Sequence, residues 1–294
     1  MRAIRVALFA PGSKERVMAK ALESGADAVI LDLEDSVPQS GKAEARALVA
    51  GAIDAAAAHP RPLVTVRTNS AATDFLAGDL EAVVRPGLAA AILPKAETVD
   101  AVQRTAAAID RHEKARDMAA GSVALILMIE SALGVHSCFD LIKASPRVAA
   151  TCFGSARDGD LQTDLGCAWS IEGTELLYAR SKVLLDTRAA GAMPLDGVFS
   201  DLNDEAGLAA DSRLSARLGY VGRTAIHPKQ IAAIRAAYAV PANEVAYYEK
   251  VVREFEAGEK AGTDAITVDG KLVDYAMFAR AKRVLELAKL DAGA

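Results

Sequence analysis

The sequence predicts an α/β fold, and within that class a closed (β/α)8 barrel (a TIM barrel) followed by a C-terminal helical extension. Short apolar runs alternate with longer segments that are rich in Ala, Leu, Glu, Lys and Arg, with apolar residues at helical spacing. Continuous apolar strands that alternate with helices indicate a parallel sheet covered on its faces. Eight such units in about 230 residues favour a closed barrel, and a doubly wound open sheet is the alternative.

The expected strands are short, and a helical segment separates each from the next. They comprise residues 5–11, 28–34, 63–69, 89–95, 124–131, 148–154, 196–202 and 222–228. Together with the helices between them, these strands assign residues 1–238 to the barrel.

The segment 239–294 is too long to be a linker. A long helix is expected first, over 240–262. "ITVDGKLV" then places two short β runs around Asp269-Gly270, which is a hairpin signal, and a last helix follows from about Asp274. We interpret this extension as a lid on its own barrel or as an oligomerisation arm that covers a neighbouring subunit.

Composition excludes several classes of protein. The net charge of −5 gives no electrostatic support for nucleic-acid binding. No apolar run reaches the roughly 20 residues that span a bilayer, and the first residues do not read as a signal peptide. Cys138, Cys152 and Cys167 are odd in number and form no CxxC pair, so we expect free thiols in a reducing compartment. These features predict a cytoplasmic protein without a membrane partner.

Polar side chains gather at the carboxyl ends of the expected strands. The stretch "ILDLEDSVP", residues 30–38, ends an apolar strand with Asp32, Glu34 and Asp35. The other strand ends carry Arg67 and Asn69, Lys95, Glu130, Asp158 and Asp160, Asp201, and His227. Because the active site of a (β/α)8 barrel lies where strands meet their following loops, this pattern predicts a polar mouth.

Two of these carboxylates suit a metal ion. Glu130 ends a very apolar strand, where a lone carboxylate is costly, and Asp160 follows the next strand. Adjacent strands lie about 4.8 Å apart, so both side chains can converge on one Mg²⁺, which prefers oxygen ligands and keeps several waters. The alternative is that Glu130 pairs with Arg67 or a lysine, and Asp158 competes with Asp160 for the metal.

Arg67 is the candidate anion ligand, because a guanidinium at a barrel mouth can hold a carboxylate with two hydrogen bonds. Its alternative role is to pair with Glu34 or Asp35. Neither GxGxxG nor GxxxxGK[ST] occurs, so dinucleotide and P-loop binding lack support.

The order of the motifs resembles one known family over nearly the whole chain. The motifs are "LFAPGSKERVMAKALESGADAVILDLEDSV", "KAEAR", "VRTNS", "ILPKAE", "MIES", "GDLQTDLG", "DGVFSD", "GRTAIHPKQI" and "VDGKLVDYAMFARAKRVL". Together they resemble the citrate lyase β-subunit-like members of the HpcH/HpaI aldolase superfamily. The resemblance implies a barrel of the phosphoenolpyruvate/pyruvate-binding superfamily type, Mg²⁺ dependence and a homotrimer or hexamer. It also implies reversible carbon–carbon cleavage of a 3-hydroxyacyl-CoA thioester, of malyl, citramalyl or citryl type, to an acyl-CoA and a 2-oxoacid.

The same resemblance implies roles for individual residues. Glu130 in "MIES" and Asp160 in "GDLQTDLG" match the metal ligands, with Glu130 also at the substrate, and Arg67 in "VRTN" matches the arginine that holds the 2-oxoacid carboxylate. Asp274 in "GKLVD" matches the acid/base aspartate of the lid, which acts from a neighbouring subunit in members with a full tail. The "DLED" carboxylates are expected to orient metal-bound water and to pair with Arg67 or lysines.

Three basic residues in the amino-terminal part of the chain are expected to contact the substrate or its phosphates. Arg16, Lys42 and Arg46 stand where basic residues can contact the substrate or CoA. The loop from "FG" to "DLG" has three more residues than the usual family pattern, which leaves the acyl group open. Two alternatives remain: an aldolase that cleaves a free 4-hydroxy-2-oxoacid without CoA, and a citryl-carrier-protein lyase subunit of a larger complex.

Overall fold

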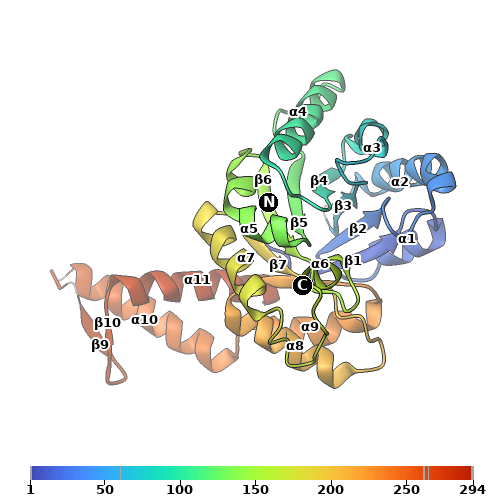
Figure 1. Cartoon of the computed structure of the whole chain (residues 1–294). Coiled ribbons are helices and arrows are strands. Elements are labelled where there is room, and N and C mark those ends of the chain that lie inside the picture. Colours follow the sequence, from blue (N-terminus) through green and yellow to red (C-terminus); the bar gives the residue numbers. More distant parts are fainter. Residues whose placement is uncertain (1, 60, 261, 264, 293–294) are drawn as a thin grey trace. The chain divides into compact units, whose positions relative to one another are not determined.

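A computed structural model of the chain describes residues 2–59, 61–260, 262–263 and 265–292. Its first unit, Met1–Ala237, is a closed barrel of eight parallel strands in sequential order, surrounded by helices (Figure 1). This confirms the predicted (β/α)8 barrel, and the open-sheet alternative is wrong. The strands are β1 (Val6–Pro11), β2 (Ala28–Asp32), β3 (Leu63–Arg67), β4 (Leu88–Leu93), β5 (Ala124–Ile129), β6 (Val148–Phe153), β7 (Met193–Asp196) and β8 (Gly222–Ala225).

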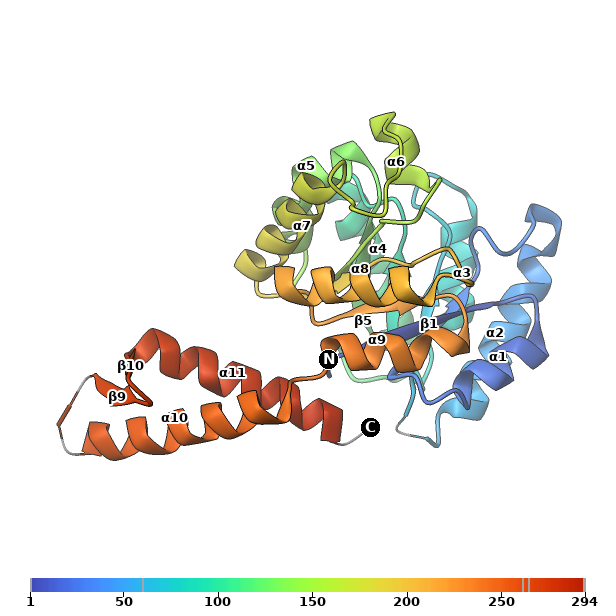
Figure 2. The ribbon, with the colours of Figure 1, turned by 90° about the horizontal axis from the view of Figure 1, so that it is seen from below.

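Helices connect successive strands and cover the outside of the barrel, as the two views show (Figures 1 and 2). They are α1 (Glu15–Leu22), α2 (Lys42–Ala56), α3 (Phe75–Val83), α4 (Val99–Ala115), α5 (Ala132–Lys143), α6 (Asp160–Leu165), α7 (Leu177–Ala190), α8 (Glu205–Leu218) and α9 (Ile231–Tyr238). Side chains cap the amino ends of α4 and α5: Thr98 accepts a hydrogen bond from the amide of Ala101, and Ser131 accepts one from the amide of Gly134. The described residues contain no helix long and apolar enough to cross a membrane.

The predicted seventh strand, residues 196–202, is wrong. The strand lies earlier, at Met193–Asp196, and Val198 and Phe199 follow it in a loop. Pro194 lacks an N–H and argues against a strand in sequence, yet its carbonyl accepts from the amide of Val221 at 3.2 Å. The strand ends before Gly197, where a Cβ would lie 2.3 Å from the carbonyl oxygen of Phe153.

The second unit, Tyr238–Ala294, contains α10 (Ala242–Lys260), β9 (Ile266–Val268), β10 (Lys271–Val273) and α11 (Tyr275–Ala292). The two strands pair antiparallel across Asp269 and Gly270, both with positive φ, which confirms the predicted hairpin. Helices α10 and α11 pack against each other with the hairpin at one end (Figure 2). The buried core comprises Val251, Phe255, Val268, Val273 and Ala281.

A buried ion-pair network ties β7 and β8 to the outer helices. Arg180 of α7 donates to Asp196 at the end of β7, and Asp211 of α8 lies 2.8 Å from Arg180 and 2.7 Å from Arg223 of β8. Arg223 is fully buried. A buried arginine that loses its carboxylate keeps the cost of desolvation, so this part of the barrel depends on Asp211.

We therefore expect Asp211→Ala to lower the free energy of unfolding by about 3–5 kcal/mol, because it leaves two buried guanidinium groups with one carboxylate fewer. Urea denaturation measures this. Asp201→Ala is the matched control: Asp201 is exposed and accepts only a local amide hydrogen bond from Asn203 within the same loop. Equal stability of the two variants would contradict a structural role for the network.

Candidate active site at the barrel mouth

The barrel mouth is organised around an ion pair between neighbouring strands. Asp32 of β2 and Arg67 of β3 occupy paired positions, and Arg67 donates to both carboxylate oxygens of Asp32, at 2.7 and 2.9 Å. Burial acts to raise the pKa of Asp32, but the hydrogen bonds and charge of Arg67 outweigh it and hold that pKa below its ordinary value. The guanidinium also lies over the ring of Phe9, 5.1 Å from its centroid.

The other two carboxylates of "DLED" reach the far side of the same guanidinium. Asp35 accepts from Nη1 of Arg67 at 3.1 Å and is exposed, whereas Glu34 is buried. Oε2 of Glu34 lies 3.0 Å from Nη1 but lacks hydrogen-bond alignment, so this buried oxygen has no hydrogen-bond partner. Burial, together with the charge of Asp35, raises the pKa of Glu34 despite the opposing effects of Arg67 and Lys95.

Glu130 follows β5 and is buried in the mouth. Its Oε1 accepts from the backbone amide of Lys95 at 2.9 Å. The backbone after β6 runs so close that a Cβ at Gly154 would lie 2.3 Å from the Cβ of Glu130, so only glycine fits there. Burial, and then the neighbouring Glu34 carboxylate, raise the pKa of Glu130 to about 7.

The structure brings Asp160, and not Asp158, towards these groups. Asp160 begins α6, and its Oδ2 lies 3.5 Å from Nζ of Lys95. Asp158 is 82% exposed in its side chain, and its ion-pair partner is its neighbour Arg157. Asp160 lines the mouth cavity, and Asp158 is not part of that lining.

The cavity at the mouth has a volume of about 470 Å³ and combines charged groups with apolar walls. Arg67, Glu130 and Asp160 line it, with Phe9 and Met128 among the apolar residues. Cys152 also lines it. Burial raises the pKa of this thiol to about 12, so Cys152 stays neutral near pH 7. Such a cavity can hold a small anion beside a cation.

The donor set fits Mg²⁺. Glu34 has a buried oxygen without a hydrogen bond, and burial, followed by the charge of the Glu34 carboxylate, raises the pKa of Glu130. A cation placed beside these carboxylates would stabilise their charged forms. Within the described ranges, no cluster of three or more His, Cys, Asp or Glu forms a metal cage. Mg²⁺ is usually held by one or two carboxylates, with waters and substrate oxygens completing its shell. Glu130 and Asp160 would be those two carboxylates.

Of the three residues predicted to contact substrate phosphates, Lys42 and Arg46 direct their charged groups to acceptors within the protein. Nζ of Lys42 is buried and donates to the carbonyls of Leu33 and Glu34, at 2.6 and 2.7 Å. Arg46 pairs with the fully buried Asp79 at 2.7 Å. Both therefore support the loop and helices around β2, and neither lines the mouth cavity.

The remaining predicted residues lie at the surface of their own units. Arg16 is exposed on α1 and does not line the cavity. Asp274 is exposed in the second unit, where its side chain accepts from the amide of Met277 and so caps α11. His227, at the end of β8, is likewise a cap: its Nδ1 accepts from the amide of Lys229. The substrate contacts expected of Arg16, Lys42 and Arg46 stay predictions.

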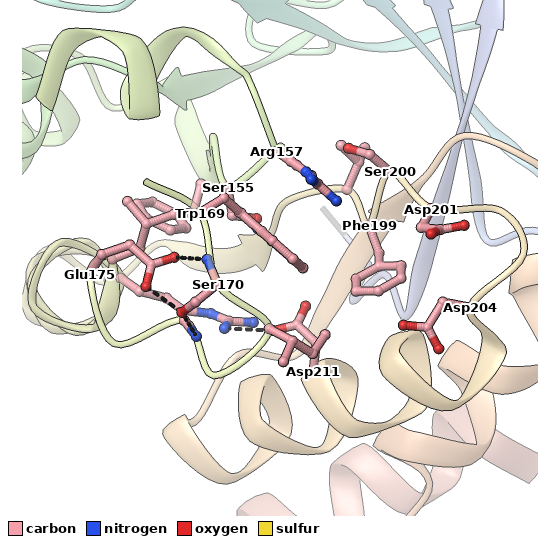
Figure 3. Close-up of a pocket in the computed structure, with 16 residues that line it drawn as sticks. Ser155, Arg157, Trp169, Ser170, Glu175, Phe199, Ser200, Asp201, Asp204 and Asp211 are labelled. Carbon is pink, nitrogen blue, oxygen red and sulfur yellow. Dashed lines mark hydrogen bonds and ion pairs between the residues drawn. The ribbon is translucent and has the colours of Figure 1, made fainter. Parts of the chain in front are cut away.

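Figure 3 shows a second, smaller cavity of about 130 Å³. It adjoins the first cavity, and both are lined by Phe153, Ser155 and Val198. The loop between β6 and α7 forms one side, where Arg157 lies over the ring of Trp169. Glu175 ties this loop together by accepting from the amide and hydroxyl of Ser170, at 2.7 and 2.6 Å. The loop that follows β6 thus borders both cavities.

Comparison with known proteins agrees with this fold and mouth. The family model described as "HpcH/HpaI aldolase/citrate lyase" matches residues 5–228. Citrate lyase subunit beta of Escherichia coli (strain K12) is 36% identical over 293 residues, which cover 99% of this chain and 95% of that protein. The mitochondrial citramalyl-CoA lyase of Homo sapiens is 29% identical over 294 residues, covering 97% and 85%.

A solved structure shows the same architecture. The crystal structure of CitE from Mycobacterium tuberculosis in complex with magnesium, acetoacetate and coenzyme A superposes with a TM-score of 0.73 at 29% identity, covering 98% of both chains. Fold, mouth and relatives together define a lyase built on a (β/α)8 barrel. The chain belongs to the HpcH/HpaI aldolase/citrate lyase family, within its citrate lyase β-subunit-like group.

The raised pKa of Glu130 predicts how stability depends on pH in the metal-free protein. The folded pKa of about 7 exceeds the ordinary 4.5, so between these values the folded state binds more protons than the unfolded state. The contribution of Glu130 therefore lowers the free energy of unfolding as pH rises through this window, by up to about 3 kcal/mol. Urea denaturation with a chelator, at intervals from pH 4.5 to 8, measures the slope.

Glu130→Gln is the comparison variant, because it keeps the side chain's shape and removes its titration. The wild-type protein should lose stability relative to this variant across the window. Parallel curves for the two proteins would show that Glu130 titrates at its ordinary pKa and that the mouth does not perturb it.

Proposed function

We propose that the chain is a Mg²⁺-dependent carbon–carbon lyase that cleaves a 3-hydroxyacyl-CoA thioester of malyl, citramalyl or citryl type, reversibly, to an acyl-CoA and a 2-oxoacid. The observation that carries this proposal is the arrangement of Arg67, Glu130 and Asp160 around one cavity. An arginine that grips a carboxylate, beside two carboxylates that suit Mg²⁺, matches the chemistry of a 2-oxoacid. The relatives named for citrate lyase and citramalyl-CoA lyase support the substrate class.

In this proposal Arg67 binds the carboxylate that becomes part of the 2-oxoacid. Asp32 holds the guanidinium from one side, so its orientation is fixed before substrate arrives. Asp35 is exposed and occupies Nη1, which makes it the contact that a substrate carboxylate can replace. A solved citrate lyase beta subunit from M. tuberculosis, 30% identical to this chain, is complexed with oxaloacetate and magnesium, which supports a 2-oxoacid as the ligand.

Glu130 and Asp160 would hold Mg²⁺, which when bound supplies a Lewis acid for the carboxylate and carbonyl oxygens of the 2-oxoacid. In the cleavage direction the 3-hydroxyl gives its proton to water, and its oxygen becomes the carbonyl oxygen of the 2-oxoacid as the C2–C3 bond breaks. The electron pair of that bond forms the thioester enolate. Asp274 is the proposed acid that protonates the enolate carbon, and it acts as the base in the condensation direction. We further propose that the second unit is a lid whose closure excludes water during this transfer.

The test is a panel of malyl-, citramalyl-, β-methylmalyl- and citryl-CoA, with and without Mg²⁺, followed by release of glyoxylate, pyruvate or oxaloacetate. One thioester should release its 2-oxoacid only with Mg²⁺. Glu130→Ala and Asp160→Asn should lower the rate by at least about a hundredfold, because each removes a metal ligand. Asp158→Asn is the matched control in the same loop, and it should keep nearly full activity because Asp158 lies outside the cavity lining.

Failure of a folded, Mg²⁺-binding protein to cleave any of these thioesters would overturn the CoA-lyase proposal. The second candidate is then a citryl-carrier-protein lyase subunit, which the 36% identity to a citrate lyase subunit beta favours. Citryl-loaded carrier protein tests it directly. Activity on a free 4-hydroxy-2-oxoacid would instead point to the CoA-independent aldolase.

The proposed homotrimer with a lid that acts between subunits makes a separate prediction. Glu130→Ala damages the barrel half of a site, and Asp274→Asn damages the lid half. If each site takes its lid from a neighbour, subunits of the two inactive variants, mixed equally and reassembled, should recover about one quarter of wild-type activity, since that fraction of sites pairs two intact halves. Activity that stays at the level of the separate variants would place Asp274 on its own barrel.

A further inference from the structure

Lys95 contacts three carboxylates of the mouth at once. Its backbone amide donates to Glu130 at 2.9 Å, and its Nζ lies 3.3 Å from Glu34 and 3.5 Å from Asp160. The residue has a φ of +50°, a left-handed conformation that few non-glycine residues adopt and that tends to occur at functional sites. This conformation lets one residue direct its amide to one carboxylate and its ammonium to the other two.

The ammonium is held more loosely than the neighbouring guanidinium. Its two distances, 3.3 and 3.5 Å, exceed the 2.7 Å between Arg67 and Asp32. Its partner Asp160 is 49% exposed in its side chain, and exposed ion pairs contribute little stability. The ammonium of Lys95 therefore offsets the negative charges of Asp160 and Glu34 through loose contacts. Another cation can replace the ammonium in these contacts.

We propose that Lys95 is a positioning residue that competes with the divalent cation: its ammonium occupies Asp160 and Glu34 until Mg²⁺ binds, and so weakens Mg²⁺ binding. This inference rests on the proposed metal role of Glu130 and Asp160. Displacement requires Asp160 to leave Lys95, and the amide of Lys95 keeps Glu130 oriented meanwhile. Because the ammonium is a built-in counter-ion, it offsets part of the repulsion between the carboxylates before the metal arrives.

The test measures Mg²⁺ affinity by isothermal titration calorimetry, with no substrate present. Lys95→Met removes the charge and keeps an unbranched side chain, so the dissociation constant for Mg²⁺ should fall by about tenfold, since a nearby positive charge no longer opposes the ion. Lys95→Arg keeps the charge and should stay within about threefold of wild type. Lys95→Gln serves as a second neutral variant, and circular dichroism checks folding.

Two further variants separate competition from other effects. Lys143→Met removes one positive charge from the end of α5 and should leave the Mg²⁺ affinity unchanged. The gain from Lys95→Met should shrink in an Asp160→Asn background, because the competition runs mainly through that carboxylate. A lysine with only a structural role would weaken the metal site on removal, which is the opposite sign.

The outcomes distinguish this inference from the proposed function. If the wild-type protein binds Mg²⁺ and both neutral variants bind it equally or more weakly, competition by Lys95 is overturned while the metal site stands. If neither the wild-type protein nor the neutral variants bind Mg²⁺, the proposed metal site and the inference fall together. Tighter binding by the neutral variants alone supports the inference.

Discussion

The pairing of Asp32 with Arg67 is the interaction on which the mouth depends. The parallel register of β2 and β3 places the two residues opposite each other, so barrel closure itself brings a carboxylate to a guanidinium. Removing Arg67 would take the ion-pair partner from the buried carboxylate of Asp32, which is costly. Lys42 stabilises the loop after β2 by donating hydrogen bonds to the carbonyls of Leu33 and Glu34. The loop after β2 is thus fixed at both its side chains and its backbone.

With Asp32 committed to Arg67, the mouth has an excess of negative charge elsewhere. Glu34 and Asp160 share the ammonium of Lys95, whereas Glu130 receives only its backbone amide. Burial raises the pKa of both glutamates, with Asp35 adding to the effect on Glu34 and Glu34 adding to that on Glu130. Proteins that keep such groups together need a counter-charge, and a divalent cation supplies more of it than a lysine. The crowding of carboxylates at the mouth thus underlies the proposed affinity for Mg²⁺.

Sequence reasoning succeeded where position along a strand decides the outcome. The ends of β3 and β5 place Arg67 and Glu130 in the mouth because all parallel strands point the same way. It failed at β7. Pro194 argues against a strand although it lies in one, and the apolar Val198 and Phe199 favour a strand although they lie in a loop. The sequence also does not predict local backbone conformation. Nothing in "LPKAE" indicates that Lys95 has a left-handed backbone conformation, or that its amide donates a hydrogen bond to Glu130.

Sequence shows where a long cationic side chain starts and not which way it points. The charged groups of Lys42 and Arg46 have buried acceptors, including the carboxylate of Asp79, and their contact with substrate phosphates stays a prediction. A buried carboxylate without a cation would be destabilising, so Asp79 and Arg46 constrain each other. Two cationic side chains at the mouth, Arg67 and Lys95, each contact an exposed carboxylate that another group can replace or withdraw. For Arg67 this carboxylate is Asp35, and for Lys95 it is Asp160. These two contacts lie on opposite sides of Glu34, and in the proposed reaction one yields to the substrate carboxylate and the other to the metal.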